Sequence, residues 1–432
     1  MTRTSSAMGS DAGRSIGEGP ALGPADLAAF KIAVMLLFVA VILGIGSSIA
    51  ILALQVLLLL VLLAFVVKDA IARRFAVDPT FGALGLILLI VGYAIVAAFI
   101  SYSDASYSTS IQIKFLLTFL STLFIVWILY YSIINGLISP EAILKCAIYA
   151  FVIYSVGKIA INIFIVMQLL QQDELRSIIR NSLGAAFIST SLFFGLIRIN
   201  LPPDFGMPIV IFCLVTSRRL GISISGKAKA FYIFVLLSAM LIAYSRYLWG
   251  VAFCATLFAT LVMGRKHLLV FTVLLLGVSG FALTTEEVRT AIENRFSSYA
   301  VDASDELRDT QMKALLDSID AQPFFGKGLA TYVPYLIRSK SSPYSYELQI
   351  LATMMQLGII GVIPILIFLA SFVSTIRTRN IFVYSMICVM YAFWILAGFT
   401  NPSLIGRAAA IVFVMFVCVG LLSPRLERQA GA

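Results

Sequence analysis

The side chains that could do chemistry in this chain are mainly arginines and one glutamate. Arg246 follows Ser245 in a short turn between two apolar runs, with Tyr244 and Tyr247 on either side. Glu347 lies where the longest hydrophilic segment returns to an apolar run. A guanidinium binds phosphate through two parallel hydrogen bonds and keeps its charge at any working pH, whereas a carboxylate can act as a general base. Together these residues predict an anionic substrate and a proton transfer.

Each of these residues also has a simpler interpretation. Arg246 among aromatic side chains could anchor a helix end at a membrane interface. Glu347 could accept hydrogen bonds from the first amides of a helix. Lys158, inside an apolar run, could extend its ammonium group to the interface or line a polar cavity. The sequence leaves these alternatives open.

Further arginines stand in polar segments and are additional candidates for binding an anion: Arg176, Arg180, Arg198, Arg295, Arg308 and Arg407. Some could pair with nearby acids such as Asp302 and Asp305, and exposed pairs of this kind contribute little to stability. Taken together, several arginines beside a membrane fit a lipid-linked phosphate or pyrophosphate.

Composition excludes a soluble enzyme and narrows the chemistry. The 432 residues are 61% hydrophobic and 12% charged, with a mean hydropathy of +1.02, whereas soluble chains are about 45–50% apolar and about 25% charged. The five cysteines lie in apolar runs at no regular spacing, and His267 is the only histidine. A disulfide framework, a metal centre and a Ser-His-Asp triad are therefore not expected, and we expect no cofactor.

The elements that must position these residues are membrane-spanning helices, which need about 20 apolar residues each. Eleven runs come near that length: 30–46, 49–67, 80–101, 113–134, 142–167, 230–245, 247–263, 268–284, 347–374, 381–398 and 404–422. Another apolar stretch, 184–217, is interrupted by Arg198 and by Leu201-Pro202-Pro203-Asp204. It could cross the membrane once or twice.

Clusters of Lys and Arg decide the orientation, because short cytoplasmic loops are enriched in them. The net charge of +10 partly reflects five such clusters, namely Lys68, Arg73 and Arg74; Arg218, Arg219, Lys227 and Lys229; Arg265 and Lys266; Arg377 and Arg379; and Arg425 and Arg428. With the N-terminus inside, all five are cytoplasmic only if 184–217 crosses once. This predicts about 12 transmembrane helices, both termini in the cytoplasm, and a re-entrant or interfacial segment near 184–203.

The predicted fold is that of an all-α polytopic membrane protein. We expect a disordered cytoplasmic leader at 1–28, spans 1–9 within 29–284, a loop domain on the outer face at 285–346, spans 10–12 within 347–422 and a cytoplasmic tail at 423–432. Within the large loop, apolar residues have helical spacing from Glu293 to Leu316, interrupted at Asp302 to Asp305. Two short helices are therefore expected there.

An ordered set of motifs carries a family resemblance. Ser245-Arg246 at a tight turn is followed by Arg295, Arg308, the segment Pro323-Phe324-Phe325-Gly326-Lys327-Gly328, and a Leu-rich helix that ends in Gly358-Ile359-Ile360-Gly361. In this order they resemble the O-antigen ligase and O-antigen polymerase superfamily, bacterial inner-membrane enzymes that act on undecaprenyl-pyrophosphate-linked glycans. The detailed resemblance covers about 184–361, and it implies a GT-C-like membrane fold.

One position departs from the ligases of that superfamily. Many of them carry a His-Asn pair eleven residues before the first Gly of the ending, where this chain has Glu347 and Leu348. That His is thought to assist the acceptor hydroxyl, so its replacement by Glu favours a polymerase over a ligase.

The resemblance implies a metal-independent glycosyl transfer on the periplasmic face. Arg246 would bind the donor pyrophosphate and stabilise its growing charge, and Glu347 would align or deprotonate the acceptor sugar hydroxyl. Helpers in binding pyrophosphate or glycan would be Arg180, Arg198, Arg295, Arg308 and Lys158. Gly326 and Gly328 would let the loop approach the glycan or simply turn tightly. Tyr344 and Tyr346 would stack on sugars or serve as interfacial aromatics.

The implied partners are an undecaprenyl-pyrophosphate-linked oligosaccharide, the lipid bilayer, and a chain-length regulator or other polysaccharide assembly proteins, but no nucleic acid. A polysaccharide or lipid transporter, or flippase, is the alternative from another class. Transporters place charged pairs and broken helices near the midplane. Here the unexpected charge lies at the outer ends of spans and in one outer loop, which favours an enzyme.

Overall fold

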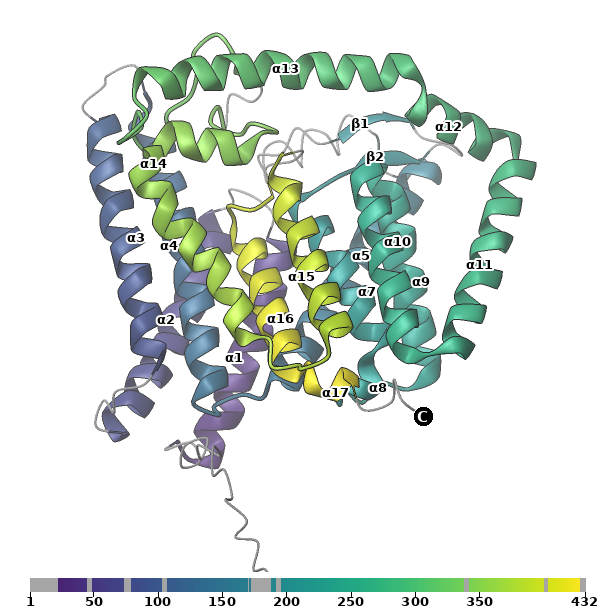
Figure 1. The fold of residues 1–432 in the computed structure, drawn as a ribbon, viewed down its shortest axis with the longest axis horizontal. Helices are drawn as coiled ribbons and strands as arrows, with labels where there is room; N and C mark the ends of the chain where they lie inside the picture. Colours follow the sequence, from purple (N-terminus) through teal and green to yellow (C-terminus); the bar gives the residue numbers. More distant parts are fainter. Residues whose placement is uncertain are drawn as a thin grey trace, which may run out of the picture.

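The computed structural model describes residues 22–44, 49–73, 79–102, 107–169, 171, 188–191, 196–337, 342–399 and 403–427. Most of these residues are helical, and long helices stand side by side in one bundle (Figure 1). Nine helices of the described part are long and apolar enough to cross a membrane. The chain is therefore an all-α polytopic membrane protein, as its composition predicts.

Five long helices form the first part of the bundle: α1 (Pro24–Leu43), α2 (Ile49–Ala72), α3 (Pro79–Tyr102), α4 (Thr109–Ile134) and α5 (Pro140–Val166). The prediction of a disordered leader up to residue 28 is wrong at its end, because α1 begins at Pro24. Pro in the first turn and the acidic Asp26 both favour a helix start there, and Asp26 pairs with Lys68 of α2 at 2.7 Å. Residues 1–21 of the predicted leader lie outside the described residues.

A short, irregular region follows α5: β1 (Ile188–Ser191), β2 (Ile197–Ile199), the 3-10 helix η2 (Pro202–Gly206), α7 (Met207–Val215) and α8 (Ser217–Leu220). The strands are antiparallel, with Ile188 opposite Ile199. Where the sequence predicts a re-entrant or interfacial segment, the described residues thus form a two-stranded ribbon. One short apolar helix, Pro202–Val215, then runs on from it.

The second part of the bundle contains α9 (Gly226–Ala243), α10 (Arg246–Met263), α11 (Arg265–Thr284), α14 (Gln349–Ala370), η3 (Ser371–Thr375), α15 (Ile381–Leu396), η4 (Ala397–Phe399), α16 (Arg407–Leu422) and α17 (Pro424–Glu427). Every residue of α16 from Ala409 to Gly420 is buried. This helix packs against α1, α4, α5 and α7, so the core of the molecule is built around it.

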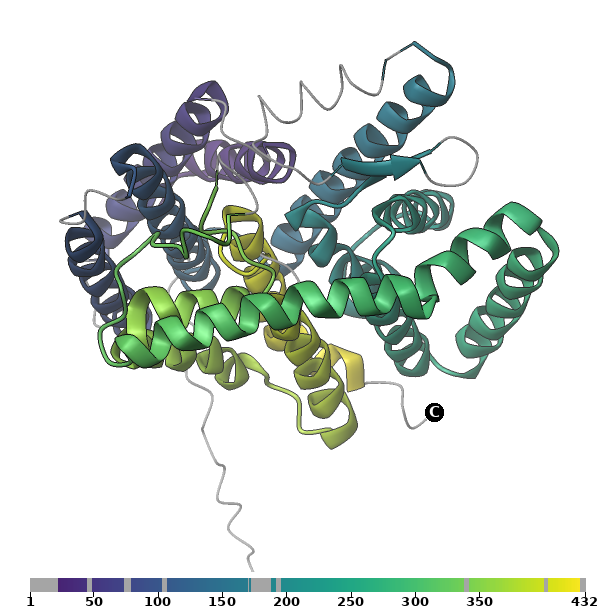
Figure 2. The ribbon, with the colours of Figure 1, turned by 90° about the horizontal axis from the view of Figure 1, so that it is seen from above.

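One face of the bundle is covered by two helices, α12 (Glu286–Phe296) and α13 (Ser298–Ala321). Seen from above, α13 crosses the bundle from the side of α11 to the side of α3 (Figure 2). Two helices are present in this loop, but the predicted break at Asp302 to Asp305 is wrong. The break lies at Ser297, between the end of α12 at Phe296 and the start of α13 at Ser298. The residues at 302 to 305 instead continue the helix α13, which runs unbroken from Ser298 to Ala321.

The long helix α14 is broken at Gly358, whose backbone has φ +62° and ψ −178°. The segment from Pro323 to Gly328 fills the break. The amides of Ile359 and Ile360, freed by the break, donate to the carbonyls of Pro323 (2.9 Å) and Phe324 (3.1 Å). The amides of Lys327 and Gly328 donate to the carbonyls of Met355 (2.9 Å) and Gln356 (3.0 Å). The break therefore leaves these backbone groups hydrogen-bonded, as buried groups require.

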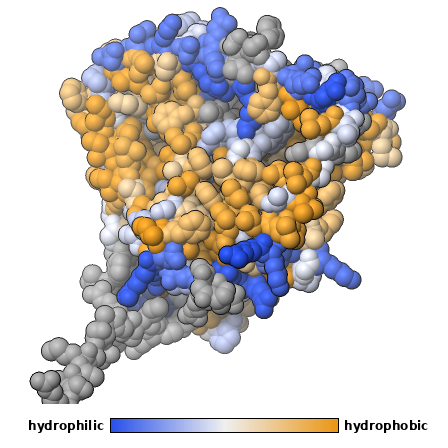
Figure 3. All heavy atoms as spheres, turned by 45° about the vertical axis from the view of Figure 1, so that its right-hand side comes forward, coloured by the Kyte–Doolittle hydropathy of each residue, from blue (hydrophilic) through white to orange (hydrophobic). Residues whose placement is uncertain are grey.

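On the face seen in Figure 3, a broad apolar band lies between two polar rims. The helix α13 lies on one rim, and α8, α17 and the described start of α1 lie on the opposite one (Figure 1). The ends of helices that carry the five basic clusters also lie on the rim opposite α13. On this rim Arg219 donates to the Leu426 carbonyl at 2.8 Å, and Arg425 pairs with Glu141, at the start of α5, at 2.5 Å.

Candidate functional site

The centre of the candidate site is an ion pair between the long loop and the start of α14. Nε of Arg308, on α13, lies 3.1 Å from Oε2 of Glu347. Nη1 of the same arginine lies 3.0 Å from Oδ1 of Asp305, one helical turn earlier. The Arg308 and Glu347 side chains keep 28% and 18% of their surface exposed, so the pair remains accessible from outside the protein. The structure thus joins two residues that the sequence singles out separately.

Gln311 supports this ion pair from the same face of α13. Its Oε1 accepts a hydrogen bond from the backbone amide of Glu347 at 3.0 Å, and its side chain is fully buried. The sequence reasoning missed this residue. Its spacing of three residues from Arg308 places it on the same helix face, which is the signal that could have found it.

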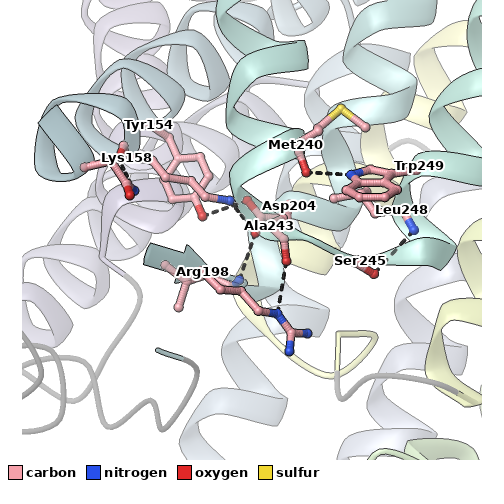
Figure 4. Close-up of polar contacts among 11 residues, drawn as sticks. Tyr154, Lys158, Arg198, Asp204, Met240, Ala243, Ser245, Leu248 and Trp249 are labelled. Atoms are coloured by element: carbon pink, nitrogen blue, oxygen red, sulfur yellow. Dashed lines mark hydrogen bonds and ion pairs between the residues drawn. The ribbon is translucent and has the colours of Figure 1, made fainter. Parts of the chain in front are cut away.

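Arg198 reaches the site from the strand β2. Its Nε donates to the carbonyl of Ala243 at 3.3 Å, at the end of α9 (Figure 4). Burial lowers the pKa of Arg198, whereas the nearby Glu347 and Tyr244 raise it. Arg198 therefore lies next to the α9–α10 turn and within electrostatic range of Glu347.

Arg246 begins α10 immediately after that turn. Tyr244 has a left-handed backbone with φ +50°, and the Ser245 hydroxyl accepts a hydrogen bond from the Leu248 amide at 3.4 Å, which caps the helix. The nitrogens of the Arg246 side chain make no hydrogen bond or ion pair with any residue in the described ranges. Arg198 donates to the carbonyl of Ala243, three residues before Arg246. Both arginines therefore lie at the same turn.

Lys158 is placed differently from the other candidates. Its Nζ lies 2.8 Å from Oδ2 of Asp204, and the Tyr154 hydroxyl donates to Oδ1 of the same carboxylate at 2.9 Å (Figure 4). The Lys158 and Asp204 side chains are 1% and 0% exposed. One turn along α5, Oδ1 of Asn162 accepts from the Ile197 amide at 2.8 Å. Lys158 therefore holds the segment that carries Arg198, rather than facing a substrate.

Tyr344 and Tyr346 lie in the turn before α14 but differ in their surroundings. Tyr346 is 1% exposed, and its hydroxyl accepts a hydrogen bond from the Val333 amide at 2.7 Å. Tyr344 packs edge-on against Phe115 of α4, with 4.5 Å between the ring centroids. Burial raises the pKa of each phenol to about 12. Both tyrosines line a cavity of about 60 Å³, and the structure gives Tyr346 a packing role.

The glycines of the loop provide close backbone contact. Gly326 has φ +71°, and a methyl group there would lie 2.5 Å from the carbonyl oxygen of Gln356. Gly328 has φ +101° and packs against Ser101 and Ala97 of α3. The left-handed conformation and the lack of space both require glycine, so these residues fasten the loop to α14 and α3.

Two predicted ligands are not brought into the site by the described part. Arg180 lies outside the described residues. Arg295 lies near the end of α12, and its side chain is outside the described part. Among the residues described, no group of three or more His, Cys, Asp or Glu side chains is arranged to hold a metal ion.

Comparison with known proteins agrees with this geometry. A search of curated proteins found no match. Residues 231–366 match the family model described as O-antigen ligase, a region that begins in α9 and ends in α14 and so includes Arg246, Arg308 and Glu347. The match supports an enzyme of the glycosyl-transfer type found in O-antigen ligases and polymerases. Over residues 231–366 the chain is therefore similar to the O-antigen ligase family, and this supports its likeness to the O-antigen ligase and O-antigen polymerase superfamily.

Proposed function

We propose that this protein is an inner-membrane glycosyltransferase that polymerises the repeat units of O-antigen, capsule or exopolysaccharide. Its donor would be a glycan on undecaprenyl pyrophosphate, and the transfer would be independent of metal. The observation that carries this proposal is the ion pair of Arg308 with Glu347, whose nitrogen and oxygen lie 3.1 Å apart and whose side chains both remain partly exposed. Arg246 begins α10 three residues after Ala243, to which Arg198 is bonded, and its guanidinium has no hydrogen bond or ion pair to a described residue, so it is available for an anion.

The reaction would proceed in one displacement. An acceptor sugar hydroxyl attacks the anomeric carbon of the donor, its C–O bond forms, and the bond from that carbon to the pyrophosphate oxygen breaks. The hydroxyl proton passes to the Glu347 carboxylate, and undecaprenyl pyrophosphate leaves with the bonding electrons. Attack from the face opposite the leaving group would invert the anomeric configuration.

The arginines would act on the leaving group. Their fixed positive charge would stabilise the negative charge that develops on the leaving pyrophosphate in the transition state. In the structure Arg308 is bound to Glu347. A bound pyrophosphate would compete for this guanidinium, and the carboxylate released from it would become a better proton acceptor.

The proposed orientation places the α13 face in the periplasm and both termini in the cytoplasm. The support is the distribution of Lys and Arg, whose five clusters lie at helix ends on the opposite rim (Figure 1), as in cytoplasmic loops of membrane proteins. Twelve spans would result if α11 and the two shorter apolar helices, Pro202–Val215 and Arg407–Leu422, cross in addition to the nine long ones.

A ligase that transfers glycan to lipid A core is the second candidate, because the matching family model is described as O-antigen ligase. Deletion of the gene in the parent bacterium separates the two. Loss of a polymerase leaves single repeat units, whereas loss of a ligase leaves long chains that are not attached to lipid A. Unchanged chain length and unchanged attachment would contradict both candidates. Complementation with the Glu347→Gln variant would connect the phenotype to the site.

A further inference from the structure

We propose that Arg407 and Lys114 form a second site for the phosphate headgroup of a membrane lipid, separate from the arginines around Glu347. In the proposed reaction this lipid would be the second lipid-linked substrate, and that role rests on the proposed function. Binding of a lipid phosphate at Arg407 and Lys114 does not depend on the proposed function.

Arg407 carries a charge that no described acid neutralises. It begins α16, and its guanidinium bonds only to neutral groups: Nε to Oγ of Ser121 at 3.0 Å, Nη1 to Oε1 of Gln55, and Nη2 to Oγ1 of Thr118 at 3.5 Å. These partners lie on α2 and α4. Inside a membrane-spanning bundle an unpaired cation is costly, and it is usually balanced by an anion.

Lys114 adds a second cation to the same place. It precedes Thr118 and Ser121 on α4 by four and seven residues, so these side chains share one helix face. Lys114 also lies within electrostatic range of Arg407, although like charges repel. Its ammonium group has no hydrogen bond or ion pair to any described residue. Because α4 starts at the α13 face, Lys114 lies nearer to that face than Arg407.

Unused polar groups occur on the same two elements. Gln112, on the first turns of α4, is 4% exposed, and neither its amide nitrogen nor its amide oxygen has a hydrogen-bond partner. Ser403, in the segment that leads to Arg407, is also 4% exposed with an unpartnered hydroxyl. Gln112 stands two positions before Lys114, so the two lie on different faces of α4. The two cations, which no described acid neutralises, match the chemistry of a phosphate or pyrophosphate, which offers several acceptor oxygens and negative charge.

The position relative to Glu347 fits a two-lipid reaction. The cavity of about 60 Å³ is lined by Phe115, next to Lys114, by Ile405, two residues before Arg407, and by Ser345 and Tyr346 of the Glu347 turn. Gln349 ties the two parts together, because its Oε1 accepts from the Leu404 amide at 2.7 Å. Arg198 and Arg246 lie instead at the α9–α10 turn. A donor headgroup at that turn and an acceptor headgroup at Arg407 would leave Glu347 between them.

The test counts lipid phosphates on the purified full-length protein by native mass spectrometry, with undecaprenyl phosphate as the probe. We expect two bound molecules per chain. Lys114→Gln should weaken the second by about tenfold or more, because a charge-assisted contact of about 1.5–3 kcal/mol is lost. Arg407→Gln should have the same effect, but it could also disturb packing, and Lys114 is the safer position because its side chain bonds no described residue. Lys145→Gln, near the start of α5, is the matched control.

The outcomes separate the two proposals. One lipid per wild-type chain, or unchanged binding in the Lys114→Gln, Arg407→Gln double variant, would overturn the second site. Phosphatidylglycerol that binds with equal affinity would assign the place to bulk lipid and overturn its role as a substrate site. Inorganic pyrophosphate that binds where undecaprenyl phosphate does not would assign it to a soluble anion, which also overturns the proposal. If Glu347→Gln left polymerisation unchanged while two lipids still bound, the proposed chemistry alone would fail.

Discussion

Glu347 stands at the meeting point of loop and membrane, and its neighbours define what it can do. The Arg308 guanidinium holds the carboxylate 3.1 Å away, and Gln311 fixes the backbone at the same residue through a 3.0 Å hydrogen bond. A carboxylate that only capped a helix would not need two side chains of α13 to orient it. The arrangement instead presents one oriented carboxylate beside Arg308.

Replacing that carboxylate should remove most of the activity without unfolding the protein. We expect Glu347→Gln to lower the rate of polymer formation by about 10²–10⁴-fold, the usual contribution of a general base, because the amide cannot accept the proton. The measurement is polymer formed per unit of membrane-inserted protein. Glu306→Gln, on an exposed position of α13, is the control and should behave as wild type. A rate for Glu347→Gln within a few fold of wild type would leave Glu347 with a structural role only.

Among the elements, the broken helix α14 and the loop that fills its break form one unit. Four main-chain hydrogen bonds join them, and the Tyr93 hydroxyl of α3 donates to the Leu357 carbonyl at 2.8 Å. The glycines are required where the two backbones touch. This unit fixes the position of α14 in the bundle and thereby the position of Glu347, which precedes it.

A methyl group at Gly326 should separate the loop from α14. We expect Gly326→Ala to destabilise the protein by about 1–2 kcal/mol or more, because its φ of +71° is unfavourable for alanine and its new Cβ would meet the Gln356 carbonyl. Thermal unfolding in detergent measures the change. Gly250→Ala is the matched control, since no atom lies within 4 Å of the added Cβ. Equal unfolding temperatures for the two variants would show that the loop is not fastened in this way.

Hydropathy predicted the elements well where a helix is long and uniformly apolar, as in α1 to α5. It could not predict the ribbon formed by Ile188–Ser191 and Ile197–Ile199, because strands of four and three residues leave no periodic signal among apolar neighbours. The aspartates at 302 and 305 suggested a helix break, yet α13 runs through them from Ser298 to Ala321.

In the candidate site, too, residue types and motif order could be predicted from the sequence, whereas contacts between distant residues could not. Residue type and motif order pointed to Arg308 and Glu347, which the structure joins. The role of Lys158 depends on Asp204, 46 residues later, and no local pattern reveals that pairing. Tyr346 is an aromatic residue of the type that stacks on sugars, but it packs with residues of α13 and is buried. Burial of this kind is a property of the assembled layers and cannot be obtained from spacing along the chain.

At the scale of the whole molecule, the two rims differ in the charge they carry. The rim opposite α13 collects the basic clusters at the helix ends, and the α13 rim carries the candidate site. If the first rim is cytoplasmic, every step of the proposed reaction takes place in the periplasm. The orientation is therefore the property on which the mechanism depends most.

Reporter fusions test this orientation directly. Alkaline phosphatase fused after residue 320, at the end of α13, should be active because the enzyme requires the periplasm, and a fusion after residue 378, between η3 and α15, should be inactive. Green fluorescent protein at the same two positions should give the reverse pattern and serves as the control for expression. An inactive phosphatase at 320 with a fluorescent partner fusion would contradict the proposed mechanism.

The helix α13 also has a mechanical consequence. Its 24 residues form a rigid rod of about 36 Å, which is joined to α12 through the single extended residue Ser297. Arg308 lies eleven residues along this rod, about 16 Å from the joint. A small tilt at Ser297 is therefore multiplied into a much larger displacement of the guanidinium relative to Glu347. Any partner that presses on the exposed surface of the rod would change the spacing of the ion pair without touching it, so that α13 would work as a lever.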